Sequence, residues 1–468
     1  MEGEMDLASE QRSLLDEYLD DFQPLVGDLR TERVLRGTVQ GIIGAETLIC
    51  AKIAAYSPEF ITNSKNGEQR IRRMVKGETT KSSDLDVDHL IERLQARGVE
   101  QLRDDDEVWA IIDPSELRKP YAKEMPDLMR VRALKGEGTV PGYRTINVLG
   151  VGKGGRRGIL YHRLFTSEAD DFLSESKEIQ DALHSVDQAL ADRRGKVTWI
   201  ADSQFDDEAV WATIWEQGNH LVCRIKHQER LVEQPLAGRD QEGSKGTWQT
   251  VPIVEVKAQA REVGRIRTEM VVRKRGQKYE KMQPVTAVIA ACPIRVRYQV
   301  DVRSRKDGPL RKKDIWLVVV TLENVGWEPW ILVTDWPVTN EEGALRVFRM
   351  YRQRWAVEDS FKFTKQVLGW EDVQLLDLEG VRMLVALGWV AAGFLYELGV
   401  TLEWPEVRLL GRLGGWTQRK DRPPGKTMLT NGLQRLLDYM ATEAFLQDEI
   451  ARYGQLPPRI AALLGRDR

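Results

Sequence analysis

Three acidic residues occupy positions from which carboxylates could act together. Asp113 follows the strand expected at 108–112 in "EVWAIIDPSELRKPY", Asp202 follows the strand expected in "GKVTWIADSQ", and Glu358 lies within the helical stretch "YRQRWAVEDSFKFTK". Three carboxylates that converge repel one another unless cations neutralise them, and hard oxygen ligands suit Mg²⁺ or Mn²⁺. Two such ions about 4 Å apart can activate a water or a 3′-hydroxyl and stabilise a leaving oxygen. The pattern favours phosphoryl transfer.

The stretch around Glu358 also carries residue types that bind phosphate. At about 100° per residue, the side chains of Tyr351, Arg354, Glu358 and Lys365 fall within roughly 60° of one another on an α-helix. They are therefore predicted to share one face. Helical spacing alone leaves a surface salt-bridge ladder open. A single aspartate at a strand end can equally be a turn or capping residue.

The elements around these residues predict an α/β sheet. The expected order is a strand ending at Asp113, two strands around a Gly-rich turn in "GYRTINVLGVGKGGRRGILYHRLF", a helix over 168–191, a strand ending at Asp202, a helix, and a strand in "HLVCRIKH". This order favours a sheet with two carboxylates at strand ends. From 228 to 338 the pattern changes to short alternating strands without a helical period, which predicts a β-rich insertion.

Helices are expected on both sides of these strands. Thr339 and Glu342 form a capping box for a helix that continues through Glu358 to a cap near Gly369. Residues 1–103 show helical periodicity, and further helices follow the one that carries Glu358. The basic segment "EQRIRRMVKGETTK" is expected to be a connection between N-terminal helices. It could contact DNA, or it could be an exposed loop of a helical bundle.

Composition is that of an ordinary soluble protein, with 42% apolar and 30% charged residues among 468. The three cysteines, Cys50, Cys223 and Cys292, have no CxxC spacing, so neither a disulfide framework nor a zinc site is indicated, and a reducing cytosol fits. The start of the chain is acidic and is unlike a signal peptide. The longest apolar run, 383–396, is too short to span a bilayer unaided and predicts a buried helix.

Charge is distributed unevenly along the chain. The net charge is −3, but residues 1–30 hold nine acidic and two basic side chains, whereas residues 261–313 hold sixteen basic and five acidic ones. Because local fields decide what a polyanion meets, the near-zero total does not exclude a nucleic-acid partner.

The spacing of these residues resembles a known family. Tyr, two residues, Arg, three residues, Glu, six residues and Lys match the YREK signature of bacterial insertion-sequence DDE transposases, the group related to the Tn-five transposase. The resemblance extends to "AIIDPSELRKPY", to "IADSQFDDEAVWATI" and to "PWILVTDWPVTNEEGALRVFRMYRQRW", and it covers roughly residues 105–400. Pro114 and Ser115 depart from it, because many relatives have a short Asp or Thr run there.

The resemblance implies a role for each matched residue. Asp113, Asp202 and Glu358 would be the DDE triad that binds two Mg²⁺ or Mn²⁺ ions in an RNase H-like fold. Tyr351, Arg354 and Lys365 would hold phosphates of the transposon end near the scissile bond. Trp330 occupies the place of a tryptophan that stacks on a flipped base while a DNA hairpin forms, although strand tryptophans are mostly core residues.

The Gly-rich segment "GVGKGG" fits GxGxxG, but it lies between two expected strands and does not open a helix, which argues against a dinucleotide site. In a transposase it would be a hairpin turn whose Lys153, Arg156 and Arg157 contact DNA. The Lys and Arg residues of 261–313 and of the link at 408–426 would add sequence-independent affinity for the DNA backbone.

The sequence therefore predicts an RNase H-like α/β mixed sheet with flanking helices, interrupted by a β-rich insertion, plus helical N-terminal and C-terminal regions. The expected division is a helical DNA-binding domain at 1–103, the catalytic domain at 104–227 and 339–400, the β-stranded insertion at 228–338 and a C-terminal helical region at 401–468.

The predicted function is cut-and-paste transposition. The protein would bind terminal inverted repeats of double-stranded DNA, with residues 62–81 favoured for reading them, and would act as a homodimer in a synaptic complex in the bacterial cytoplasm, associated with the nucleoid. The alternatives are a metal-dependent structure-specific nuclease and a non-catalytic DNA-binding descendant of a transposase. A dehydrogenase is a distant third.

Overall fold

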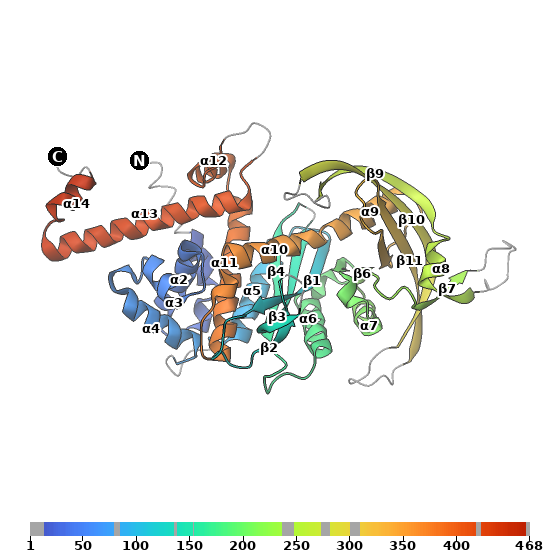
Figure 1. The fold of residues 1–468 in the computed structure, drawn as a ribbon, viewed down its shortest axis with the longest axis horizontal. Coiled ribbons are helices and arrows are strands. Elements are labelled where there is room, and N and C mark those ends of the chain that lie inside the picture. Colours follow the sequence, from blue (N-terminus) through green and yellow to red (C-terminus); the bar gives the residue numbers. More distant parts are fainter. Residues whose placement is uncertain are drawn as a thin grey trace.

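A central sheet joins a helical end of the molecule to an end built of long strands (Figure 1). The structure, a computed structural model, describes residues 14–78, 85–134, 138–152, 154–235, 248–272, 281–299, 309–417 and 423–464. The described N-terminal residues are helical, as predicted. Their elements are η1 (Gln23–Leu25), α2 (Leu29–Ala45), α3 (Cys50–Tyr56), η2 (Ile61–Asn63), α4 (Ser64–Val75) and α5 (Val87–Gln101).

Helix α4 corrects one prediction. The basic segment 68–81 was expected to be a connection, but it lies in α4 as far as Val75. Ile71, Met74 and Val75 are buried, so spacings of three and four residues place one apolar face against the neighbouring helices. The basic residues occupy the other face. Residues 79–81 of this segment lie outside the described residues.

The central strands form the RNase H-like part of the sheet. Strand β3 pairs antiparallel with β1 and β4, β1 pairs parallel with β5, and β5 pairs parallel with β6. Helices α6 and α7 follow β4 and β5. The elements are β1 (Val108–Arg118), β2 (Met129–Arg132), β3 (Thr139–Gly152), β4 (Arg157–Phe165), α6 (Glu175–Ala189), η3 (Ala191–Arg193), β5 (Val197–Ala201), η4 (Ser203–Phe205), α7 (Glu208–Glu216) and β6 (His220–Arg224). Helix α6 is shorter than the predicted 168–191 because Ser174 caps it.

Strand β1 does not end at Asp113, where the sequence predicted a turn. It continues to Arg118 and pairs with β3 over its whole length, whereas its pairing with β5 ends at Ile112. Pro114 therefore lies where β1 has lost one of its two neighbours, a place where a strand tolerates a residue without an N–H group.

The sheet separates two hydrophobic cores, and alternate residues of one strand enter different cores. Ala110 and Ile112 of β1 pack in the core of α6 and α7, whereas Ile111 packs in the core that includes α10. Strand β5 behaves in the same way, because Ala201 faces the first core and Ile200 the second. Side chains two residues apart point to the same face. Positions 113 and 202 therefore face α10.

The segment between β6 and the C-terminal helices is β-rich, as predicted, and it continues the same sheet. Strand β12 pairs antiparallel with β6, and β11 and β10 extend from it. The stretch "TWQTVPIVEVKAQA" was predicted to be strand only, but its second half forms the helix α8. The elements are β7 (Leu231–Pro235), β8 (Trp248–Pro252), α8 (Ile253–Lys257), β9 (Arg261–Val272), β10 (Lys281–Gln299), β11 (Leu310–Leu322) and β12 (Trp330–Thr334).

The predicted helix through Glu358 is two helices, α9 (Glu341–Arg352) and α10 (Arg354–Gln366), that meet at Gln353. The backbone N–H of Gln353 donates to Met350 and that of Ala356 to Gln353, so bonds between residues three apart tighten the chain at the junction. The predicted capping box is also displaced, because Asn340 caps α9 through Gly343. Gly369 lies three residues beyond the end of α10, at φ +60°, and passes close to Thr47.

The apolar run 383–396 is part of a buried helix, as predicted, but that helix is longer than the run. Helix α11 (Leu378–Thr401) is long and apolar enough to cross a membrane by length and composition, yet 83% of its most apolar window is buried within the protein. A buried core helix passes the same test. The remaining elements are η5 (Trp370–Asp372), α12 (Trp404–Leu413), α13 (Lys426–Tyr453) and α14 (Pro458–Leu463).

Candidate active site

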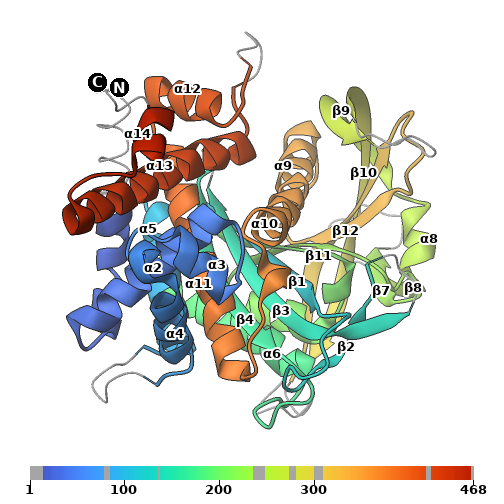
Figure 2. The ribbon, with the colours of Figure 1, turned by 60° about the vertical axis from the view of Figure 1, so that its left-hand side comes forward.

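One pocket of about 340 Å³ is lined by Asp113, Asp202 and Glu358. Strands β1 and β5 run parallel with Ile112 opposite Ala201, so the next residue of each strand is an aspartate at the same edge of the sheet. Both aspartates face α10, which lies alongside β1 and carries Glu358 (Figure 2). The structure thus places the three carboxylates around one space.

Asp113 is the most enclosed of the three, with 8% of its surface exposed. Burial raises the pKa of its carboxyl well above the usual range, and the charges of Asp202, Glu358 and Glu116 raise it further, while Arg354 opposes them. The pocket is lined by four carboxylates and three arginines, so its formal charge is negative when all of them are ionised.

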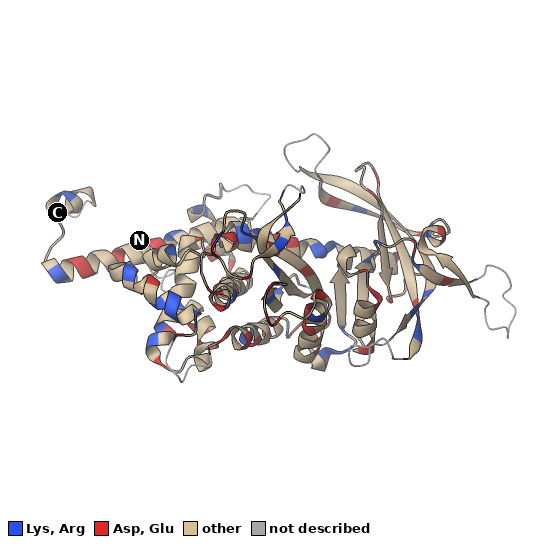
Figure 3. Ribbon diagram, turned by 60° about the horizontal axis from the view of Figure 1, so that its bottom comes forward, with Lys and Arg blue, Asp and Glu red and all other residues tan. Residues whose placement is uncertain are grey.

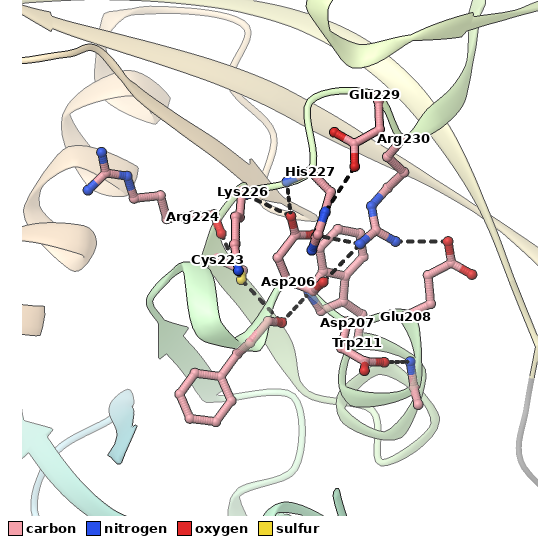
Figure 4. Close-up of polar contacts among 12 residues, drawn as sticks. Asp206, Asp207, Glu208, Trp211, Cys223, Arg224, Lys226, His227, Glu229 and Arg230 are labelled. Carbon is pink, nitrogen blue, oxygen red and sulfur yellow. Dashed lines mark hydrogen bonds and ion pairs between the residues drawn. The ribbon is translucent and has the colours of Figure 1, made fainter. Parts of the chain in front are cut away.

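The loop that carries Asp202 is fixed at two points. The Asp202 carboxylate accepts a hydrogen bond from the backbone N–H of Gln204 at 2.8 Å. Further along the loop, the buried Asp206 accepts bonds from the backbone N–H groups of 226–227 and from the Arg230 guanidinium, each at 2.7 Å (Figure 4). These bonds tie the loop after β5 to the segment after β6.

Glu358 is ion-paired with Arg354, one helical turn before it. The distance from Arg354 Nη2 to Glu358 Oε1 is 2.6 Å, and the side chains are 14% and 47% exposed respectively. The pair is therefore open to solvent on the side of the glutamate.

Lys365 joins α10 to the outer part of β1. Its Nζ donates to the backbone carbonyl of Glu116 at 2.6 Å and lies 3.9 Å from the Glu371 carboxylate. Burial lowers the pKa of this ammonium, with Glu371 acting in the opposite direction. The bond occupies the edge of β1 that β5 has left, so Lys365 helps to hold α10 over the pocket.

Tyr351 does not share the α10 face with Arg354, because the junction at Gln353 separates them. It is 2% exposed and belongs to α9. Its hydroxyl is buried without a hydrogen-bond partner among the described residues, and burial raises its pKa to about 12. Of the four signature residues, Arg354 and Glu358 line the pocket, and Tyr351 and Lys365 lie behind them.

The donor set suits a hard divalent cation, but the side chains are not arranged around one as they stand. Across the described residues, no three Asp, Glu, His or Cys side chains are gathered closely enough to hold a metal ion. One reason is that Glu358 is engaged by Arg354. The carboxylate oxygens and the uncompensated charge around Asp113 nevertheless fit Mg²⁺ or Mn²⁺.

Residues 173–392 match the family model of the transposase DDE domain. The matched stretch contains Asp202 and Glu358, and Asp113 lies before it. The match supports an insertion-sequence DDE transposase and so agrees with the resemblance seen in the sequence at the level of the DDE domain. No curated protein matches the chain.

Within the DDE-domain stretch, Trp330 is buried, with 4% of its surface exposed. Its ring lies 5.4 Å from that of Tyr351, 5.3 Å from that of Trp355 and 6.1 Å from that of Phe348. This is the arrangement of a core tryptophan. The sequence allowed both a core position and a base-stacking role for Trp330.

The turn between β3 and β4 is a hairpin, as predicted, and its two described arginines differ. Arg156 is paired with Asp104 at 3.2 Å and Asp105 at 3.1 Å. The side chain of Arg157 has no hydrogen-bond or ion-pair partner among the described residues and lines a groove of about 1080 Å³ beside α9 and α10. Lys153 lies outside the described residues.

The basic segment 261–313 is largely neutralised where it is described. Six of its described cations pair with carboxylates of the same chain: Arg265, Arg295, Arg297, Arg311, Lys312 and Lys313. Basic and acidic residues are likewise interspersed along the ribbon (Figure 3). The described part of segment 261–313 therefore has fewer cations without a carboxylate partner than the sequence suggested.

Three arginines near the pocket were missed by the sequence analysis. Arg118 and Arg132 line the pocket. Arg224, at the end of β6, lies close enough to Tyr351 for its charge to oppose the rise in the pKa of the Tyr351 hydroxyl that burial causes. Arg118 stands five residues after Asp113 and would have been found had β1 been extended beyond Asp113. Arg132 is brought in by pairing of β2 with β3, for which the sequence carries no local signal.

Proposed function

We propose that this protein is a DNA transposase that cuts and joins phosphodiester bonds at the pocket of Asp113, Asp202 and Glu358. The observation that supports this most directly is the register of β1 and β5, which places two aspartates side by side on the face where α10 contributes a glutamate. The match to the transposase DDE domain supports the same reaction class.

In this proposal the three carboxylates hold two divalent ions, Mg²⁺ or Mn²⁺. Bound there, the ions would promote deprotonation of an attacking water or 3′-hydroxyl and stabilise the leaving oxygen. The protein supplies the positions of the ligands. Hydrogen bonds to Asp206 hold the Asp202 loop, and Lys365 ties α10 to β1, so that Glu358 remains within the pocket.

We further propose that DNA changes the partner of Arg354. In the structure this guanidinium is paired with Glu358. A phosphate of the scissile strand is an equally good bidentate partner, and its arrival would free the carboxylate for a metal ion. Arg354 would then hold the strand, while Glu358 completes the ligand set.

The other residues that were expected to contact DNA differ in their burial and in their partners within the protein. Arg157, whose guanidinium has no partner among the residues that the structure describes, is proposed as a phosphate contact. Arg156 would position the hairpin through Asp104 and Asp105. Tyr351 and Trp330 lie together behind the pocket, so a stacking role for Trp330 requires that it leave this cluster. Helix α4, with exposed basic residues, is the proposed reader of the inverted repeat.

The wider reaction is proposed to be cut-and-paste transposition of an insertion sequence. Two ends would be paired in a homodimeric synapse, each end nicked by activated water, and the freed 3′-hydroxyl used for hairpin formation and later for strand transfer. This places the protein in the group with the YREK signature, acting on DNA in the bacterial cytoplasm at the nucleoid.

The test uses a supercoiled plasmid carrying the DNA that flanks the coding region, with Mg²⁺. We expect cut ends and joined products with the wild-type protein. Glu358→Gln should reduce cutting by about 10³-fold or more, equivalent to about 4 kcal/mol of barrier, while end binding persists. Asp359→Asn is the matched control, because Asp359 is the next residue and lines the other groove.

Two outcomes would overturn the proposal in different ways. Cut ends without joined products would identify a nuclease. Binding without cutting by the wild-type protein would identify a non-catalytic descendant.

A further inference from the structure

The active-site pocket has a second wall, formed by the hairpin of β2 and β3. Arg132, Ala133 and Leu134 line the pocket together with Arg354 and Glu358 of α10. None of the residues singled out in the sequence belongs to this wall. The residues of this wall differ from those of α10 in their charge and in their partners.

Arg118 fixes the hairpin over the pocket. Its Nε donates to the backbone carbonyl of Arg132 at 2.8 Å, and its guanidinium pairs with Glu116 at 2.9 Å and lies 3.5 Å from Glu371. Strand β2 is also held by antiparallel pairing with β3. The end of β2 is therefore held in place beside the carboxylates.

The three arginines that line the pocket differ in their ion-pair partners. Arg354 pairs with Glu358 and Arg118 with Glu116, whereas the Arg132 side chain is exposed and has no hydrogen-bond or ion-pair partner among the described residues. Four carboxylates line the same pocket and repel a polyanion. The Arg132 guanidinium offsets this repulsion for an anion that approaches the carboxylates.

Leu134 adds an apolar contact next to Arg132. Its side chain is 81% exposed and lines the same pocket. Apolar side chains at protein–DNA interfaces pack against sugars and unstacked bases, and some are inserted between base steps. A leucine presented beside a phosphate-binding arginine suits a nucleotide that has left the regular duplex.

We propose that residues 132–134, at the end of β2, are a second DNA-binding element of the active site, in which Arg132 binds a backbone phosphate and Leu134 packs on the adjacent nucleotide. The scissile strand would be held between this wall and α10. This inference rests on the proposed function and adds a subsite to it.

The first test measures how binding of a fluorescein-labelled duplex of the flanking DNA depends on salt. Loss of one phosphate contact lowers the slope of log affinity against log salt by about 0.9, so Arg132→Ala should show that reduction and about tenfold weaker binding at low salt. Arg130→Ala is the matched control, because Arg130 lies on the same strand but is bonded to Thr139. Equal slopes for the two variants would overturn the proposal.

The second test places 2-aminopurine next to the cut position that the wild-type protein defines. Leu134→Ser should reduce the rise in emission that reports unstacking, whereas Leu173→Ser, at another exposed leucine, should not. An unchanged rise for Leu134→Ser overturns the apolar contact.

The two levels of proposal are separable. If the wild-type protein neither binds nor cuts the flanking DNA, the proposed function and this inference both fail. If it does both and Arg132→Ala behaves as Arg130→Ala, only this inference fails.

Discussion

The two walls of the acidic pocket use their basic residues differently. On the α10 wall, Arg354 is paired with Glu358 and Lys365 is bonded to the Glu116 carbonyl, so both cations stabilise the protein itself. On the β2–β3 wall, the Arg132 side chain has no hydrogen-bond or ion-pair partner within the described part of the chain. An anion that binds Arg354 must therefore displace Glu358, whereas an anion that binds Arg132 displaces no described side chain.

The sharpest way to break this comparison is Arg354→Ala. Without its guanidinium we expect cutting to fall by about 10²-fold, as for loss of one preorganised donor. The affinity for Mn²⁺ in the absence of DNA should rise, because Glu358 is released and the pocket becomes more negative. Plasmid cutting and Mn²⁺ titration calorimetry measure the two effects.

The control for the Mn²⁺ titration is Arg349→Ala, since Arg349 is exposed on α9 and does not line the acidic pocket. If Arg354→Ala bound Mn²⁺ less tightly than the wild type, the ion pair would not be the competitor that we describe.

Lys365→Met tests the supporting role of the α10 wall. A hydrogen bond from a charged group is lost, so the free energy of unfolding should fall by about 1.5–3 kcal/mol, and cutting should fall with it. Lys362→Met is the matched control, because Lys362 is exposed on the same helix. Urea unfolding measures the difference. Equal stability of the two variants would show that the bond to the Glu116 carbonyl does not hold α10.

Asp113→Asn should stabilise the metal-free protein while it abolishes cutting. The folded pKa of Asp113 is raised by burial, so the stability linked to this carboxyl is fully present below its unfolded pKa and is lost as the pH rises through the folded value. At neutral pH the variant should therefore be more stable by about 1 kcal/mol or more.

Thermal unfolding in the presence of EDTA, measured at a series of pH values from neutral down to about 4, checks this prediction. The difference in stability between the variant and the wild type should become smaller as the pH falls. Mn²⁺ should then raise the melting temperature of the wild type but not of Asp113→Asn. A variant less stable than the wild type at neutral pH would contradict the electrostatic account of the pocket.

The smallest effects are expected at the β3–β4 hairpin. Its two adjacent arginines show the same contrast as the two walls of the pocket, because Arg156 is ion-paired within the protein and Arg157 has no partner among the described residues. Arg156→Ala should cost about 0.5–1 kcal/mol of stability through its lost ion pairs. Arg157→Ala should leave stability unchanged and lower the salt dependence of DNA binding. Thermal unfolding and fluorescence anisotropy separate the two, and identical behaviour of both variants would remove the distinction between committed and uncommitted arginines.

Much of the fold was predictable because local patterns determine it. The buried strands over 108–112 and 197–201, the hairpin around "GVGKGG" and the helix that contains 383–396 follow from runs and periods of apolar residues. The errors occur where two local signals compete. Strand β1 continues past Pro114 because β3 still pairs with it, and α4 extends through a basic segment because Ile71, Met74 and Val75 bury one face.

Asp113, Asp202, Arg354 and Glu358 of the pocket were singled out from the sequence, but Arg118 and Arg132 were not, and neither were the contacts between these side chains. Periodicity placed Tyr351 on one face with Arg354, but bonds between residues three apart at Gln353 separate the two. Nothing in the sequence distinguishes Arg156 from Arg157, because the difference lies in the carboxylates of Asp104 and Asp105 that reach only one of them.

The sequence by itself determined the residue types and spacings, and with them three carboxylates, the signature around Glu358 and the order of strands and helices. Only the tertiary structure decided which cations are already committed and which remain available. The physical reason is that a hydrogen bond or ion pair depends on distances between residues far apart in the chain. Lys365 meets the Glu116 carbonyl across 249 positions, and Arg132 reaches the pocket only because β2, β3 and β1 lie side by side.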